Sequence, residues 1–387
     1  MSSVQEMYCL KEGRNNYEIY ADRDSEFYVP RSGVDVESIT KKIQIDLITE
    51  RCPKRFVAGT YGAGKTHTLF TVTTALKKVL SETPYEVEVV YVSAPDFPRN
   101  AKFIDLYAHI LKTIGKPKIL TLFEKLQQEF ILQKLGWKRD ELASAIHERL
   151  GKVNYDLASV FSITLADTNL VWRWLIGSTS SGSELTTLGV SSHLKEGDPQ
   201  MLVKILETIG TLFETYEKRK LIVLLDECER WEDLSKDALD SLNLGFLRLA
   251  DKSNKHVSVI WSISTEAGGW ETETTVVEEP VISRIGPKNR IEIPPLEHPD
   301  AIRFMKDVIQ YVRDPKCDVK AKIAKNPPSE AVDDSTYPFS EEALEQILAG
   351  ITEETELTPR RLIDALSNAV GNAALDKSLY VYSSFIE

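Results

Sequence analysis

A short run of residues has the types and the spacing needed to hold a chain of phosphates. It reads Gly59-Thr60-Tyr61-Gly62-Ala63-Gly64-Lys65-Thr66, the pattern GxxxxGK[ST]. Glycines in such a loop let backbone N–H groups close around a phosphate, and a following helix N-terminus adds partial positive charge. In this pattern Lys65 contacts the β- and γ-phosphates and the Thr66 hydroxyl ligates Mg²⁺. The sequence therefore predicts a phosphate site from Gly59 to His67, with ATP and Mg²⁺ as its ligands.

The segments that flank this P-loop have the patterns of a strand and a helix. The apolar run Arg55–Ala58 precedes the loop, and residues 66–80 read as a helix. A loop between a strand and a helix is the context that phosphate binding requires. Other expected elements are a strand at 86–93 and helices at 36–47, 103–114 and 199–218.

Two acidic residues, Asp226 and Glu227, follow the apolar run Leu221–Leu225. A continuous apolar run of this kind indicates a strand buried on both faces, and ligand sites in parallel sheets lie at the carboxyl ends of the strands. We expect Asp226 to hold Mg²⁺ and Glu227 to activate water as a general base. Alone, the pattern also fits a strand that ends in a solvated acidic loop. The P-loop upstream, with the additional strand at 86–93 in between, favours the P-loop ATPases that use a catalytic glutamate.

Polar and basic residues farther along could complete the site. Residues 256–265 read as a buried strand, and a polar residue at its end would face the γ-phosphate, with Thr265 the first choice and Ser264 the second. Arg284 could be an arginine finger that stabilises charge on the γ-phosphate. Arg290 is a rival for that role, and a surface salt bridge is the alternative for Arg284.

The composition narrows the class of protein. The chain has 387 residues, of which 42% are hydrophobic and 27% charged, as in a globular protein of two or three domains. Its formal net charge of −12 argues against sequence-independent wrapping of nucleic acid, although not against a local basic patch. No signal-peptide pattern and no apolar stretch long enough to span a membrane occur. The scattered cysteines form no CxxC pair, and this argues against a metal site and against a disulfide framework. A reducing, cytoplasmic location is therefore expected.

The pattern of elements predicts a division into an N-terminal arm at 1–26, an α/β core at 27–293 with a helical insertion at about 117–198, and a helical lid at 294–387. Lid helices are expected at 300–312, 341–348 and 359–375, with a charged loop at 316–335. The last helix opens with Thr358 as N-cap and Pro359 at the first position, which would let Arg360 reach back to the nucleotide. Near the arm, Tyr28 and Arg31 could contact the nucleotide base, or the arm could simply pack on the core.

The order of the P-loop, the acidic pair, Thr265, Arg284 and Arg360 is typical of AAA+ ATPases, and residues 27–375 resemble an AAA+ module of the replication-initiator type. Four strings are similar to the ATP-binding proteins of BREX-type phage-exclusion systems: Tyr61–His67, Val171–Gly177, Leu188–Val190 and Leu225–Glu229. One string contains Trp172 and Trp174, which read as core aromatics or as a partner-binding surface. The resemblance implies an α/β P-loop NTPase fold of the AAA+/ASCE type, with a parallel sheet core and a C-terminal helical lid.

The resemblance also implies a function. We expect Mg²⁺-dependent ATP hydrolysis that drives or gates a multiprotein, DNA-associated complex, for example in anti-phage defence, with the chain as part of a homo- or hetero-oligomer. In that arrangement Arg284 would serve a neighbouring subunit. Replication initiators carry a winged-helix DNA-binding domain after the lid that has no counterpart here, so we expect weak DNA binding by the isolated chain. A STAND-like nucleotide-gated switch and a DNA-loading factor are the alternatives.

Overall fold

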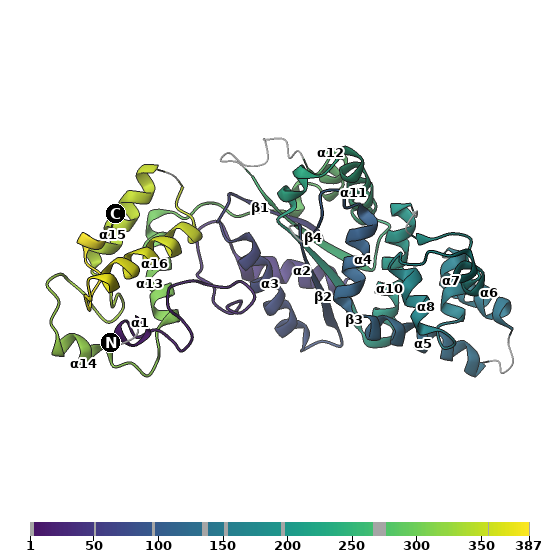
Figure 1. The fold of residues 1–387 in the computed structure, drawn as a ribbon, viewed down its shortest axis with the longest axis horizontal. Coiled ribbons are helices and arrows are strands. Elements are labelled where there is room, and N and C mark those ends of the chain that lie inside the picture. Colours follow the sequence, from purple (N-terminus) through teal and green to yellow (C-terminus); the bar gives the residue numbers. More distant parts are fainter. Residues whose placement is uncertain are drawn as a thin grey trace.

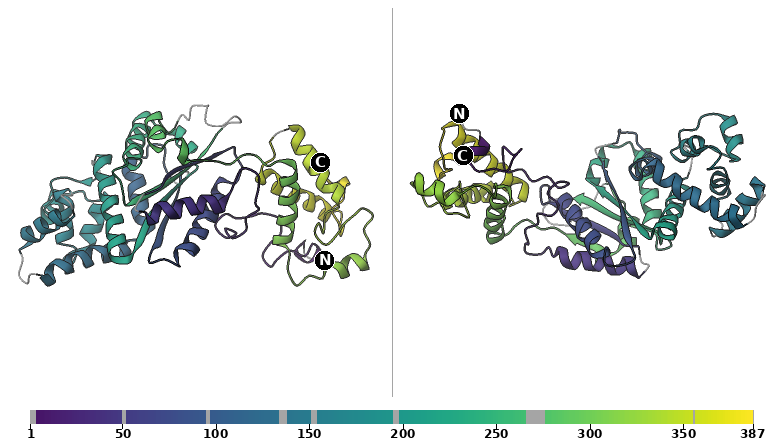
Figure 2. Two further views of the ribbon diagram at one scale, coloured as in Figure 1. Left: turned by 180° about the vertical axis from the view of Figure 1, so that it is seen from behind. Right: turned by 90° about the horizontal axis from the view of Figure 1, so that it is seen from below.

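In the computed structural model the chain is described over residues 4–49, 52–94, 97–133, 138–150, 154–194, 198–265, 276–354 and 356–386. Figure 1 shows an elongated molecule in which a parallel sheet lies between two groups of helices. The views in Figure 2 show the same arrangement from behind and from below.

The sheet has the strand order β2-β3-β4-β1-β5 within the described residues, and all of its pairs are parallel. The strands are β1 (Lys54–Gly59), β2 (Glu86–Ser93), β3 (Arg219–Asp226), β4 (Val257–Ser264) and β5 (Arg290–Glu292). The central strands β3 and β4 are buried over almost their whole length, as expected where helices cover both faces of a parallel sheet.

The additional strand that separates β1 from β3 is β4. The sequence analysis assigned this position to residues 86–93, and that assignment was wrong, because those residues form β2 at the edge of the sheet. Order along the chain does not give order in the sheet when crossover connections intervene. The conclusion drawn from the additional strand is unaffected, since a strand does lie between the P-loop strand and the acidic one.

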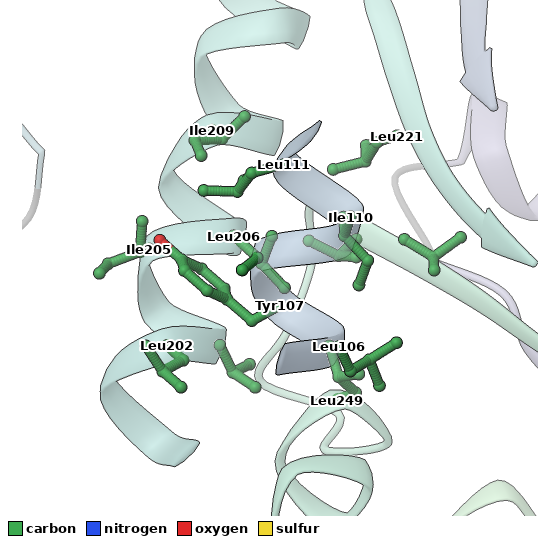
Figure 3. Close-up of a cluster of buried hydrophobic side chains, with 14 of the residues drawn as sticks. Leu106, Tyr107, Ile110, Leu111, Leu202, Ile205, Leu206, Ile209, Leu221 and Leu249 are labelled. Atoms are coloured by element: carbon green, nitrogen blue, oxygen red, sulfur yellow. The ribbon is translucent and has the colours of Figure 1, made fainter. Parts of the chain in front are cut away.

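Helices cover the two faces of the sheet with separate apolar clusters. On one face, α2 (Val36–Ile48) and α3 (Lys65–Leu80) pack on inward residues such as Val57 and Ile260. On the other, side chains such as Val223 and Trp261 belong to a larger cluster. That cluster includes α4 (Phe103–Ile114), α10 (Pro199–Glu217), α11 (Lys236–Leu249) and α12 (Glu279–Ile285). Figure 3 shows the contact between α4 and α10, with aliphatic side chains of both helices around Tyr107.

A group of helices between α4 and α10 forms the end of the molecule away from the lid (Figure 1). Its members are α5 (Lys116–Gln133), α6 (Arg139–Arg149), α7 (Tyr155–Ser162), α8 (Thr168–Leu175) and α9 (Gly182–Leu188). Trp174 is fully buried here and donates its indole N–H to the carbonyl of Ser192 at 3.1 Å. Trp174 is thus a core aromatic, and Trp172 packs against the same cluster half-buried.

The opposite end of the molecule is a helical lid, which we call the lid bundle and which comprises α13 (His298–Val312), α15 (Glu341–Glu354) and α16 (Pro359–Leu375). Thr358 caps α16 by accepting a hydrogen bond from the N–H of Arg361, and Pro359 occupies the first turn, as predicted. The segment expected as a charged loop contains a helix, α14 (Val319–Lys325), which Asp318 caps. Short 3-10 helices complete the fold at η3 (Cys228–Asp233), η5 (Pro287–Asn289) and η6 (Ser383–Phe385).

The N-terminal arm, which starts with α1 (Val4–Met7), packs on the lid bundle. Tyr8, Leu10 and Tyr17 are buried in the same apolar cluster as the lid helices. Cys9 forms a disulfide with Cys317, with a Cα–Cα distance of 5.8 Å. The sequence analysis expected no disulfide framework and missed this bond, because a partner 308 residues away leaves no local spacing signal. We propose that the arm and the lid bundle form one structural unit.

The hydroxyl of Tyr107 is buried without a hydrogen-bond partner among the described residues. Tyr107→Phe should therefore leave the free energy of unfolding unchanged or raise it by up to about 1 kcal/mol, because an unpaired polar group leaves the core. Tyr8→Phe is the matched control, since Tyr8 is also a buried tyrosine but its hydroxyl donates to the carbonyl of Ser378 at 2.8 Å. The control should lose about 1 kcal/mol in urea unfolding. Equal losses in the two variants would contradict the prediction.

Candidate nucleotide site

The P-loop joins β1 to α3, and atoms of neighbouring segments lie close to its glycines. Gly62 and Gly64 have φ values of 79° and 92°, in the left-handed region that favours glycine. A Cβ at Gly59 would lie 2.5 Å from the carbonyl oxygen of Ile293, so no side chain fits there. The N-terminus of α3 follows directly at Lys65, which leaves its first N–H groups facing the loop. This local structure has the backbone geometry that anion binding requires.

Lys65 lies at the centre of the site, with only 8% of its surface exposed. Its ammonium donates to the carbonyls of Gly59 and Thr60 at 3.0 and 3.1 Å, and to Ser264 Oγ at 2.9 Å. Burial lowers the pKa of Lys65, and the carboxylates of Glu229, Asp226 and Glu227 oppose that shift. The three carboxylates stabilise the charged form of the buried ammonium, and the phosphates of a nucleotide would compete for its hydrogen bonds.

Asp226 ends β3 beside the first turn of α3. Its Oδ2 accepts hydrogen bonds from Thr66 Oγ1 at 2.6 Å and from the Tyr91 hydroxyl at 2.9 Å. Its Oδ1 is buried without a partner among the described residues. A carboxylate oxygen without a hydrogen-bond partner, next to a hydroxyl, suits a hard cation that prefers oxygen ligands. Thr66 and Asp226, the predicted metal ligands, therefore lie together and fit Mg²⁺.

Glu227 follows Asp226 in the left-handed conformation, with φ 54° and ψ 38°. This conformation is costly for a residue with a Cβ and is found mostly where function requires it. Burial raises the pKa of Glu227, and the neighbouring Asp226 carboxylate adds to the shift. Both acids line the same cavity as Lys65 and Thr66, as the sequence predicted.

The polar position at the end of β4 is occupied by Ser264. Its hydroxyl accepts from Lys65 and donates to Glu229 Oε1 at 2.5 Å, while its backbone N–H donates to Glu229 Oε2 at 2.9 Å. Thr265, the first choice in the sequence analysis, lies one residue farther, where its N–H donates to the carbonyl of Gly59 at 3.1 Å. We therefore assign this position to Ser264, in place of Thr265. The shift arises because β4 pairs with β1 in a register that places Ser264 opposite Gly59.

Glu229 is the residue of this site that the sequence analysis missed. It belongs to the string Leu225–Glu229, but nothing in its spacing marked it as a partner of Ser264. The link becomes visible only after the turn at Glu227 brings η3 over the end of β4.

Arg360 comes from the first turn of α16 and reaches the P-loop. Its guanidinium lies over the ring of Tyr61, 5.1 Å from the ring centroid, and its backbone N–H donates a hydrogen bond to the carbonyl of Gly62 at 3.4 Å. A Cβ at Gly62 would lie 3.0 Å from the Cβ of Arg360. The lid bundle thus touches the loop directly, and Arg360 lines the cavity as predicted.

The segment after the N-terminal arm forms another wall of the site. Arg31 donates from Nη2 to the carbonyl of Ala63 at 2.7 Å, and its Nη1 is buried without a partner among the described residues. His67, predicted as part of the nucleotide site, lines the cavity but bonds through Nε2 to the carbonyl of Phe27. Burial lowers the pKa of His67. Tyr28 bonds to the carbonyl of Val34 at 3.0 Å and also lines the cavity.

These walls enclose a cavity of about 360 Å³, within the size range of small-molecule sites. Its lining includes the P-loop, the acidic pair and Ser264. It also includes apolar residues of the N-terminal segment and of the lid bundle, among them Ile19, Val29, Phe304 and Ile363. The cavity therefore offers both polar and apolar groups, as the phosphates and the base of a nucleotide need.

Arg284 lies on α12, outside the residues that line this cavity. It donates to the carbonyl of Leu247 at 3.0 Å and pairs with Asp251 at 2.9 Å. Its rival Arg290 begins β5 and is half-buried, and it too is absent from the cavity lining. Neither arginine belongs to its own chain's site as described.

No protein-family model matches the sequence, and no curated protein matches it. Solved structures are similar to most of the chain. The Aeropyrum pernix ORC1 protein in complex with DNA has 14% identity and a TM-score of 0.50, and the match covers 94% of this chain and 65% of that one. The A. pernix ORC2 protein, in complexes with ADPNP and ADP, has 11% identity and a TM-score of 0.47, over 94% of this chain and 70% of that one.

At this identity the likeness shows the fold alone. The chain has an α/β P-loop fold with a parallel sheet and a C-terminal group of helices, similar to the fold of the A. pernix ORC1 protein, so the predicted α/β fold class is confirmed. The chain spans 65% of the length of the ORC1 chain. Among the described residues, no helix is long and apolar enough to cross a membrane.

Gly62 offers a test of the contact between loop and lid. Gly62→Ala should weaken ATP binding by roughly 10-fold, because a left-handed alanine costs about 1–2 kcal/mol and its Cβ would press on Arg360. Gly371→Ala is the control: this glycine is in α16, and a Cβ there would meet nothing within 4 Å. The control should keep its ATP affinity and gain up to about 1 kcal/mol of stability. Unchanged ATP affinity of Gly62→Ala in calorimetric titration would contradict the assignment.

Proposed function

We propose that the protein is an Mg²⁺-dependent ATPase whose hydrolysis drives or gates a multiprotein complex. The observation that carries this proposal is the Thr66–Asp226 hydrogen bond of 2.6 Å, which joins the P-loop helix to the acidic strand in front of Glu227. A passive phosphate site would need the loop and Lys65 only. Hydrolysis also requires a metal site and, beside it, a second carboxylate that can activate water.

Each residue has a separate task in this mechanism. Lys65 and the first N–H groups of α3 bind the phosphates, and Arg31 fixes the shape of the loop through the carbonyl of Ala63. Mg²⁺, held by Thr66 and Asp226, would neutralise charge between the phosphates. Glu227, with its raised pKa, accepts a proton from the attacking water. Arg360, whose guanidinium lies over the ring of Tyr61, would contact the γ-phosphate of its own site.

The setting of this activity follows from further features. ORC1 of A. pernix was solved in complex with DNA, and we extend association with a DNA-processing complex to this chain as part of the proposal. The net charge of −12 favours contact with DNA through partners or a local patch rather than through the whole surface. The BREX-like strings support a role in anti-phage defence.

The position of Arg284 supports an assembly of more than one subunit. Arg284 does not line the nucleotide cavity of its own chain, and 39% of its side chain is exposed. It could therefore complete the nucleotide site of a neighbouring subunit. Its bond to Asp251 would have to be exchanged for the phosphate of that neighbour. A monomeric, STAND-like switch is the second candidate, favoured by the contact of Arg360 with the P-loop within one chain. One tightly held nucleotide after purification, with negligible turnover, would select the switch.

The assignment of the acidic pair can be tested by substitution. Glu227→Gln should keep ATP affinity while hydrolysis falls by roughly 100-fold or more, because the general base is lost and the metal ligand remains. Lys65→Ala should lose ATP binding itself. Steady-state phosphate release and ATP titration separate the two outcomes, and a Glu227→Gln variant that hydrolyses ATP at the wild-type rate would refute the mechanism.

Assembly can be tested by mixing variants. Arg284→Ala should lower hydrolysis with little loss of ATP affinity, and adding Lys65→Ala protein should restore part of the rate. In such a pair the first chain supplies an intact P-loop and the second supplies the arginine. Arg290→Ala, mixed in the same way, tells which of the two arginines acts as the arginine finger. A rate per subunit that stays constant upon dilution to a monomer, with no rescue in the mixture, would favour the monomeric switch.

A further inference from the structure

Both carboxylate oxygens of Glu229 accept hydrogen bonds from Ser264. Oε2 accepts from the backbone N–H at 2.9 Å, and Oε1 accepts from the hydroxyl at 2.5 Å. The same hydroxyl accepts from Lys65 Nζ at 2.9 Å. We infer that Glu229 is a positioning residue for the proposed ATPase, which acts through Ser264 to place the ammonium of Lys65. This inference rests on the proposed function and adds a task that neither Asp226 nor Glu227 performs.

The direction of the Ser264 hydroxyl is the first step of the argument. A serine hydroxyl has one hydrogen and two lone pairs. A carboxylate only accepts and an ammonium only donates, so the hydrogen of Ser264 must point to Glu229 and a lone pair must face Lys65. In this arrangement Ser264 has no hydrogen left for a phosphate. It therefore holds Lys65, rather than sensing the γ-phosphate directly.

The hydrogen bonds of Lys65 are the second step. An ammonium has three hydrogens, and the carbonyls of Gly59 and Thr60 and the hydroxyl of Ser264 accept one each. Gly59 is the last residue of β1 and Thr60 is the first residue after it, so both carbonyls belong to the segment that leads directly to Lys65. Ser264 is the acceptor that comes from a different strand, β4, and it links Lys65 to the neighbour of β1 in the sheet. The negative charge of Glu229 strengthens that link, since bonds to charged groups are the stronger ones.

The platform that carries Glu229 is rigid enough for this task. Its neighbours in η3, Cys228 and Trp231, are 0% and 2% exposed and belong to the large apolar cluster. Trp231 packs against Phe246 of α11, with ring centroids 5.3 Å apart. The two buried residues fix η3 on the core, which leaves Glu229 directed at the end of β4. Glu227 precedes η3 in the left-handed turn and faces the cavity separately.

The experiment compares Glu229→Gln with Asp233→Asn, which removes the same charge from an exposed position of the same 3-10 helix. A glutamine has one amide oxygen, so it can accept from the Ser264 N–H or from the Ser264 hydroxyl, and its NH2 group then faces the other donor. We expect kcat for ATP to fall by roughly 10- to 100-fold, the range for outer groups that orient a functional ligand. The preference for ATP over ADP should fall by roughly 10-fold, because a displaced Lys65 loses the γ-phosphate first. Asp233→Asn should keep both values.

A double-mutant cycle separates positioning from mere support of the fold. Ser264→Ala should reproduce the effect of Glu229→Gln, and the double variant should be no worse than either single one, because both break the same link. Ser264→Thr keeps the hydroxyl and the N–H, and it should retain most of the activity. Effects that multiply in the double variant, or a Glu229→Gln enzyme equal to Asp233→Asn in kcat and in ATP preference, would overturn the inference.

Failure of the inference and failure of the proposed function give different results. If the wild type turns over ATP, Glu227→Gln does not, and Glu229→Gln behaves as Asp233→Asn, then only the inference fails. If the wild type does not hydrolyse ATP but Glu229→Gln and Ser264→Ala lower the ATP preference non-additively, then the ATPase proposal fails and the link to Lys65 stands.

Discussion

The register of the parallel sheet is the constraint on which the site depends. Gly59 pairs with Ser264 and Ser93 pairs with Asp226, so the strands that carry the P-loop, the acids and the polar serine end at one edge. A slip of one residue would turn these side chains to the other face of the sheet. The register is held by apolar side chains on both faces, which cannot be exposed without large cost. The chemistry of the edge is thus fixed by packing in the middle of the strands.

The sequence was sufficient for the parts whose signal is local. The P-loop, the acidic pair and the cap of α16 at Thr358 are short motifs with a direct physical reason for each residue, and their local structures agree with the prediction. The helices at 103–114 and 359–375 begin and end where the pattern indicated. Hydrophobic periodicity and capping suffice for such elements, because neighbours in sequence determine them.

The sequence was insufficient where distant residues meet. The choice of Ser264 over Thr265 depends on the pairing of β4 with β1, which no window around either residue contains. Glu229 becomes a partner of Ser264 only through the turn at Glu227. In the same way, Cys9 and Cys317 look unrelated until the arm lies on the lid bundle. Each case required a tertiary contact that single-sequence patterns do not encode.

The burial of the arm in the lid bundle has a consequence for how the chain acquires its structure. Tyr8, Leu10 and Tyr17 leave the ribosome before the α/β core, yet the helices that cover them begin at His298. During synthesis the arm must remain without its apolar partners while the whole α/β core is made, since domains form in the order in which they emerge. Closing a loop of this length also slows folding, because distant contacts form late. The newly made arm is therefore a segment that chaperones would be expected to protect.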